Sequence, residues 1–178
     1  MSRKKRIRFV LWTAAVLCMA AIFLFSAEPA DDSSQTSGPF VDIWIALFHP
    51  EYGELSPAEQ FDVRENASFI VRKIAHFSIF AILGALLTFA FSVDLKLRRS
   101  ACAAFLAGTL YAVSDELHQL AVPGRAGQVR DVLIDACGVL TGTLAAVALV
   151  SAVGAILKRK EKEDQPNGSD QRKTRTGV

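Results

Sequence analysis

Four apolar segments alternate with polar segments along this chain, and each is long enough to cross a membrane as a helix. They cover residues 9–27, 72–93, 100–122 and 132–157. At 1.5 Å of rise per residue, about 20 apolar residues cover the ~30 Å hydrocarbon layer of a bilayer. The pattern predicts an all-α integral membrane bundle of four transmembrane helices, in one membrane domain over residues 9–157.

The segment between the first two predicted spans contains two further helical signals. Residues 40–48 are apolar but too short to cross, and His49-Pro50 ends the run, so we predict a short helix in the membrane interface. It is open whether this helix is a packing lid or contacts lipid. Ser56-Pro57-Ala58-Glu59 has the form of a capping box. A helix beginning there can continue without a break into the second span.

The distribution of charge predicts an orientation. Hydrophobic residues make up 51% of the chain although 21% of residues are charged, so the charges must lie in loops, tails and helix ends. Lys and Arg cluster in residues 1–8, 96–99 and 158–162, which four spans place on one side, and the positive-inside rule makes that side cytoplasmic. The opposite loop, residues 28–71, has nine acidic residues and one basic residue, Arg64. We expect a multi-pass protein of the bacterial cell membrane with both termini cytoplasmic.

The two ends of the chain have different characters. Residues 1–8 form a basic cytoplasmic N-terminus, and we expect the first span to remain as an uncleaved anchor. A cut after Ala27 would place Phe25 where signal peptidase needs a small residue. Residues 158–178 are rich in both charge signs and have no periodicity, so they are predicted to be a disordered cytoplasmic tail.

The titratable residues of the last three predicted spans gather at their outward ends. The set comprises Arg72, Lys73 and His76 of the second span, Asp115, Glu116, His118 and Gln119 of the third, Arg125 of the following turn, and Asp131 and Asp135 of the fourth. Charged faces in a membrane must look inward, because contact with lipid is costly. Pro123 and Gly124 make a tight turn, which we expect to direct Arg125 toward the carboxylates. The pattern predicts one polar site among the ends of helices two, three and four.

Two interpretations of this cluster stay open. In the first, ion pairs fasten three helices and the charges are purely structural. In the second, the residues line an outward pocket, where His76, Glu116 and His118 are candidates for proton transfer. The ligand-binding candidates are then Arg72, Lys73, Asp115, Gln119, Arg125, Asp131 and Asp135. A metal site built from His76, His118 and a carboxylate matches no tight ligand spacing, so we expect no metal and no cofactor.

Several short motifs, in this order and spacing, resemble the VanZ-like membrane proteins of the teicoplanin-resistance type. They are Phe25-Ser-Ala-Glu-Pro29, Arg72-Lys-Ile-Ala-His-Phe77, Asp115-Glu-Leu-His-Gln119 and Pro123-Gly-Arg125, followed by Asp131, Gly138 and Gly142. The resemblance covers nearly everything from the first to the last predicted span. Asp135 stands where Asn is common in that family, which adds a buried charge.

The resemblance implies a link to low-level resistance to teicoplanin, a lipid-bearing glycopeptide that acts on cell-wall precursors outside the membrane. With the outward polar site, it implies recognition or modification of a membrane lipid or lipid-linked cell-wall precursor. The alternative is a non-catalytic membrane module that acts through partner binding or bilayer packing. Whether the protein is an enzyme stays open. We expect no nucleic-acid partner, and a transport pathway would require a homo-oligomer.

Overall fold

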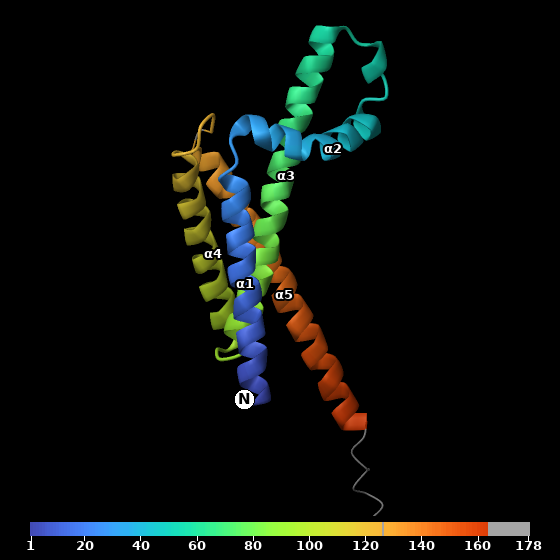
Figure 1. Ribbon diagram of the computed structural model, residues 1–178. Coiled ribbons are helices and arrows are strands. Elements are labelled where there is room, and N and C mark those ends of the chain that lie inside the picture. The colour runs from blue at the N-terminus through green and yellow to red at the C-terminus, as the bar shows by residue number, and fades with distance from the viewer. Residues whose placement is uncertain (126, 164–178) are drawn as a thin grey trace, which may run out of the picture.

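The computed structural model describes residues 1–125 and 127–163, and these residues form helices and turns without a strand. The elements are α1 (Arg3–Ser26), α2 (Ala30–Phe48), a 3-10 turn (Tyr52–Glu54), α3 (Pro57–Ser92), α4 (Leu97–Gln119) and α5 (Val129–Glu163). The described residues are therefore all-α, as predicted. In Figure 1, α1, α4 and α5 surround the second half of α3, while α2 lies across its first half.

Among the described residues, three helices are long and apolar enough to cross a membrane, namely α1, α3 and α5. These correspond to the first, second and fourth predicted spans. The apolar part of α4 is shorter because Arg99 precedes it and Asp115 interrupts it near its end. This helix packs beside α3 and α5, and its crossing of the membrane stays a prediction.

Helix α3 begins at the predicted capping box and runs unbroken to Ser92. The Ser56 backbone N–H donates to Glu59 Oε2 at 2.9 Å, and the Glu59 N–H donates to Ser56 Oγ at 3.5 Å. Hydrogen bonds from the Ser56 side chain and backbone lower the pKa of Glu59 below its ordinary value. Because the helix starts here and not near Arg72, its first half extends beyond the ends of α1 and α4 (Figure 1).

Helix α2 contains the predicted apolar segment but begins ten residues before it, at Ala30. It ends at Phe48 with His49 as its C-cap, as the His49-Pro50 pair indicated. Val41 and Ile45 are buried against Ala67 of α3. This contact holds the second half of α2 against α3, and its position at a membrane interface stays a prediction.

Both ends of the bundle differ from their predicted bounds. Helix α1 includes part of the basic N-terminus, and α5 continues through residues 158–163, the first part of the predicted disordered tail. An ion pair between Arg159 and Glu163, at 3.0 Å and one turn apart, stabilises this last segment. The rest of the predicted tail, residues 164–178, lies outside the described residues.

Helices α3 and α5 approach each other at the level of their backbones. A Cβ atom on Gly142 would lie 1.7 Å from the Ala81 carbonyl oxygen, and one on Gly138 would lie 2.4 Å from that of Phe77. The face of α5 that contains Gly138 and Gly142 is therefore a helix contact. It brings the start of α5 against the middle of α3, where His76 lies.

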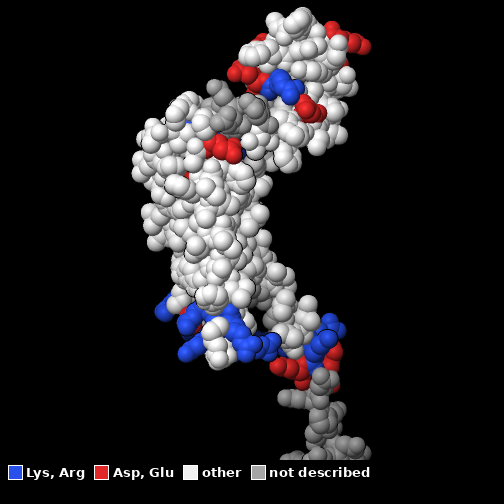
Figure 2. Space-filling view, in the orientation of Figure 1, with Lys and Arg blue, Asp and Glu red and all other residues white. Residues whose placement is uncertain are grey.

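Basic residues gather at the end of the molecule where α1 begins, and a band without Lys or Arg separates them from the opposite end (Figure 2). Lys4 and Arg8 of α1 pair there with Asp94, at 3.1 and 3.3 Å. This asymmetry agrees with the charge pattern from which a cytoplasmic side was predicted.

Candidate functional site

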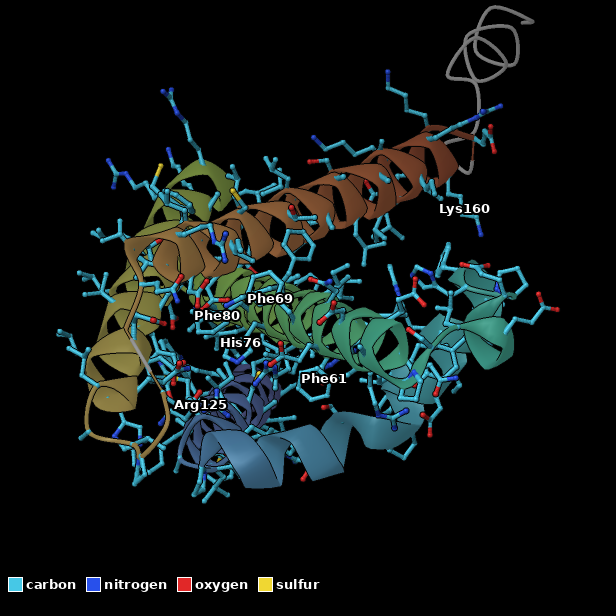
Figure 3. All side chains as sticks on the ribbon, turned by 90° about the horizontal axis from the view of Figure 1, so that it is seen from above. Phe61, Phe69, His76, Phe80, Arg125 and Lys160 are labelled. Atoms are coloured by element: carbon cyan, nitrogen blue, oxygen red, sulfur yellow. The ribbon has the colours of Figure 1, made fainter. Side chains whose placement is uncertain are left out.

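At the opposite end, α3, the last turn of α4, the turn that follows it and the first turns of α5 enclose a cavity of about 150 Å³. Its lining comprises Phe69, Arg72, Lys73, His76, Glu116, Gln119, Gly124, Arg125, Gln128, Asp131, Ile134 and Asp135. The predicted site residues therefore line this cavity, apart from Asp115 and His118. Viewed from this end in Figure 3, His76 lies in the interior among the helices and Arg125 lies beside α1.

Asp115 is buried next to the cavity and fastens α4 to α1. The Ser26 hydroxyl donates to Asp115 Oδ2 at 2.8 Å, and Gln119 Nε2 donates to the same oxygen at 3.2 Å. Ser26 is fully buried, and sequence reasoning did not single it out as a site residue. The feature that could have identified Ser26 is its position at the end of an uncharged span, within the motif Phe25-Ser-Ala-Glu-Pro29.

His118 lies outside the cavity. Its ring stacks on Phe23 of α1, with ring centroids 4.3 Å apart. His118 lies three positions after Asp115, and this spacing places the two side chains on nearby but different lines of α4. His118, predicted with His76 as a candidate for proton transfer, is therefore not among the residues that line the cavity.

Lys73 joins α3 to α5 through an ion pair with Asp131, and both side chains are largely buried. The Lys73 ammonium also lies over the Phe69 ring, 5.1 Å from its centroid. Arg72, one residue earlier, forms no ion pair within the described part of the chain; its Nε donates to the Ser68 carbonyl oxygen at 3.4 Å. Among the described residues, Arg72 therefore lines the cavity without an acidic partner.

Arg125 follows Gly124, whose φ of 74° is a conformation that favours glycine. Its guanidinium donates to the carbonyl oxygens of Glu28 and Phe25, at 3.0 and 3.3 Å. The residue lines the cavity as predicted, but it hydrogen-bonds to the end of α1 and not to the carboxylates. Burial lowers the pKa of Arg125, and the neighbouring positive charge of Arg72 acts in the same direction.

Glu116 fixes the start of α5. The backbone N–H of Gln128 donates to Glu116 Oε1 at 2.5 Å, just before the helix begins at Val129. A carboxylate is favourable here because the first N–H groups of a helix have no partner within it. Gln128 was not predicted as a site residue, because it acts through its backbone and its side-chain type carries no signal.

His76 and Asp135 form the inner part of the cavity. His76 Nδ1 lies 3.7 Å from Asp135 Oδ2, which is longer than a hydrogen bond. The nearest ligand atoms of His76, Asp115 and Asp135 all lie within 4.8 Å of one another. These three side chains come from α3, α4 and α5, and they are the described residues best placed to hold a metal ion.

A second, larger hollow of about 690 Å³ lies beside the polar cavity, between the end of α1, α2 and α3. Its lining is mostly apolar and includes Phe40, Trp44, Leu47, Ile74 and Ile79. Arg72, His76 and Arg125 line both spaces. The polar cavity and the apolar groove therefore share these three side chains in their walls.

Long apolar helices and a polar cavity at one end of their bundle define a helical membrane protein. The model of one protein family, described as VanZ/LLP1, matches residues 11–151. The chain belongs to this family, and the matched segment includes every residue that lines the cavity. No curated protein and no solved structure matches the chain.

Proposed function

We propose that this VanZ-type membrane protein binds an anionic amphiphile at an outward-facing site, and thereby reduces susceptibility to teicoplanin-type glycopeptides. The amphiphile is an envelope lipid or a lipid-linked cell-wall precursor. The observation that carries the proposal is the junction of two spaces of opposite character. The polar cavity and the apolar groove share Arg72, His76 and Arg125, so one molecule can place a charged group in the first and a chain in the second.

The charged group is argued from the basic residues at the junction. Lys73 is engaged by Asp131, whereas Arg72 has no acidic partner in the described chain and lies close enough to Arg125 for their charges to repel. Two neighbouring guanidinium groups form a strong site for a phosphate, because each can donate two parallel hydrogen bonds. A phosphate also removes the repulsion between them.

The apolar chain is argued from the groove. Its volume of about 690 Å³ lies within the ~300–1,000 Å³ typical of small-molecule sites. Aromatic and aliphatic side chains of α2 and α3 line it. A lipid chain placed there would bury its apolar surface against these side chains. A free sugar phosphate has no apolar part to bury in this space.

The charge cluster thus divides into two parts. Lys73 with Asp131, and Asp115 with Ser26 and Gln119, have the partners expected of a structural fastening. Arg72 lacks such a partner and is the residue we assign to ligand binding. Occupation of the site by a surface lipid or precursor would leave fewer sites for a lipid-bearing glycopeptide outside the membrane, which is the effect implied by the VanZ resemblance.

The test compares Arg72→Gln with Arg64→Gln. Both residues lie on α3, but Arg64 pairs with Asp42 at 2.8 Å and does not line the cavity. We expect Arg72→Gln to reduce affinity for an anionic amphiphile about 10- to 100-fold, because one charge-assisted hydrogen-bonding group is lost. Native mass spectrometry measures the retained lipid, and teicoplanin susceptibility in a deletion background measures the cellular effect.

Arg64→Gln should match the unsubstituted protein in both measurements, and fluorescence-detected size-exclusion chromatography should show that both variants are folded. A folded Arg72→Gln variant with unchanged lipid retention and unchanged susceptibility would contradict the proposal. That result would favour a module whose charges are only structural.

A further inference from the structure

We propose that His76, Asp115 and Asp135 form a binding site for one divalent transition-metal ion at the inner end of the cavity. Their ligand atoms lie within 4.8 Å of one another. The three residues come from α3, α4 and α5, so the site lies where these helices converge. The inference goes beyond lipid binding, because an ion can occupy this position with or without an amphiphile.

The first argument is the unmet hydrogen-bonding capacity of two buried carboxylates. Asp135 is 1% exposed and Asp115 is 3% exposed. Neither oxygen of Asp135 has a hydrogen-bond partner, and Asp115 Oδ1 has none either. Ionised carboxylates in this state are costly, because neither water nor a donor replaces their hydration. A bound metal ion would coordinate one oxygen of each carboxylate.

The second argument is local charge. Lys73 is paired with Asp131, and Arg125 donates to carbonyl oxygens of α1. Within the described residues, His76 is the one basic side chain within ion-pair distance of Asp135, and Asp115 has none. Two carboxylates with a neutral imidazole carry a charge that a divalent cation balances.

The third argument is the type and geometry of the ligands. One imidazole with two carboxylates suits Zn²⁺ or Mn²⁺, since imidazole favours zinc and carboxylate oxygens also accept manganese. With metal–ligand distances of about 2.0–2.2 Å, two ligands of one ion lie at most about 4.4 Å apart. The observed 4.8 Å limit therefore requires only a small inward movement of the side chains.

Three protein ligands leave at least one coordination position open, as in zinc sites that also bind water or substrate. His76 and Asp135 line the cavity, so this position faces the space in which we place the anionic group. A cation there attracts the same class of ligand as the neighbouring guanidinium groups, but it is a separate site with its own ligands.

The experiment uses the full chain, purified in detergent without a polyhistidine tag, treated with chelator and then loaded with Zn²⁺ or Mn²⁺ alone. After desalting, inductively coupled plasma mass spectrometry measures the metal content. We expect one ion per chain. We expect Asp135→Asn and His76→Gln each to weaken metal affinity at least about tenfold. Loss of a residue that only hydrogen-bonds to a metal ligand already weakens affinity by about this factor, and loss of a ligand itself should weaken it more.

The chain provides a matched control for the histidine. His118→Gln changes a histidine that stacks on Phe23, outside the cavity. This variant should keep the metal. Arg72→Gln should also keep it, so loss of lipid binding and loss of metal binding can be told apart.

A spectroscopic measurement tests the ligand directly. Electron-spin-echo envelope modulation of the Mn²⁺-loaded protein should show a coupled imidazole nitrogen, which His76→Gln should abolish and His118→Gln should preserve. Because Gln keeps a polar side chain of similar size, His76→Gln serves as the comparison if Asp135→Asn does not fold. A folded protein that takes up neither ion, or one that binds equally well with all three ligands replaced, overturns the proposal.

Discussion

At the scale of single residues, Asp115 links the structural and chemical parts of the cluster. Its Oδ2 accepts hydrogen bonds from Ser26 and Gln119, its Oδ1 has no partner, and the carboxylate lies in the group formed with His76 and Asp135. One carboxylate therefore fixes α1 against α4 and remains available to a metal. Ser26 makes this possible because it holds the carboxylate in one orientation.

We predict that Ser26→Ala destabilises the fold by about 1–2 kcal/mol, because a buried carboxylate loses its closest donor. Thermal unfolding in detergent measures the change. Ser114→Ala is the control, since the Ser114 hydroxyl is exposed and donates only to Tyr111 of its own helix. Equal melting temperatures for the two variants would show that the contact between α1 and α4 does not depend on Ser26.

The sequence predicted the membership of the cluster better than its pairing. Residue type and helical spacing were sufficient to choose Arg72, Lys73, Asp131 and Asp135, because charges in apolar spans must turn inward. They were not sufficient to predict which helix the His118 side chain contacts. Successive residues of an α-helix are rotated by 100°, so a small rotation of α4 changes the helix that a given side chain faces. Contact with Phe23 depends on where α1 packs, which no local pattern specifies.

At the scale of helices, the contact between α3 and α5 determines where the site forms. Gly138 and Gly142 allow the two backbones to approach, and Val139 between them is fully buried. One turn before Gly138, the same side of α5 presents Asp135 to His76. The packing of glycines thus sets the distance between the charged groups.

We predict that Gly142→Ala destabilises the protein by about 1–3 kcal/mol through overpacking, because even one Cβ atom would meet backbone of α3. Gly154→Ala, on the same helix, is the control. Nothing lies within 4 Å of its Cβ position, so the higher helix propensity of Ala should leave stability unchanged or raise it by up to about 1 kcal/mol. Thermal unfolding of both variants in detergent provides the measurement, and the prediction fails if their melting temperatures agree.

Helix bounds were predictable where a local signal exists. The capping box at Ser56 gave the start of α3, because its hydrogen bonds involve residues only three apart. Residues 30–39 carry polar side chains and Pro39, and nothing local predicted that α2 begins at Ala30. Val41 and Ile45 of that helix pack on Ala67 of α3, and a tertiary contact of this kind cannot be predicted from the local sequence of α2.

At the scale of the whole molecule, the two ends have different charge. The basic end contains the start of α1 and the link between α3 and α4, and the cavity lies at the opposite end (Figures 1 and 2). If the basic end is cytoplasmic, the cavity opens toward the outside of the cell. The proposed function depends on this orientation.

We predict that a membrane-impermeant maleimide labels Gly53→Cys in intact cells and labels Lys96→Cys only after permeabilisation. The background lacks Cys18, Cys102 and Cys137. Gly53 has open space around its Cβ position, so the substitution should not disturb the fold, and the positive-inside rule places Lys96 in the cytoplasm. Labelling of Lys96→Cys in intact cells would place the cavity on the cytoplasmic side and exclude an outward site.

The sequence by itself determined the apolar helices, the capping box, the separation of basic from acidic ends and the set of charged residues in the cluster. Each of these follows from local periodicity, hydrogen bonds over three or four residues, or the cost of exposing charge to lipid. Tertiary structure alone decided that Lys73 joins Asp131, that Arg125 contacts α1, and that His76 faces Asp135 and Asp115. Those choices depend on how closely α3 and α5 pack and how each helix is rotated, because a neighbour's identity is set by contacts across the bundle.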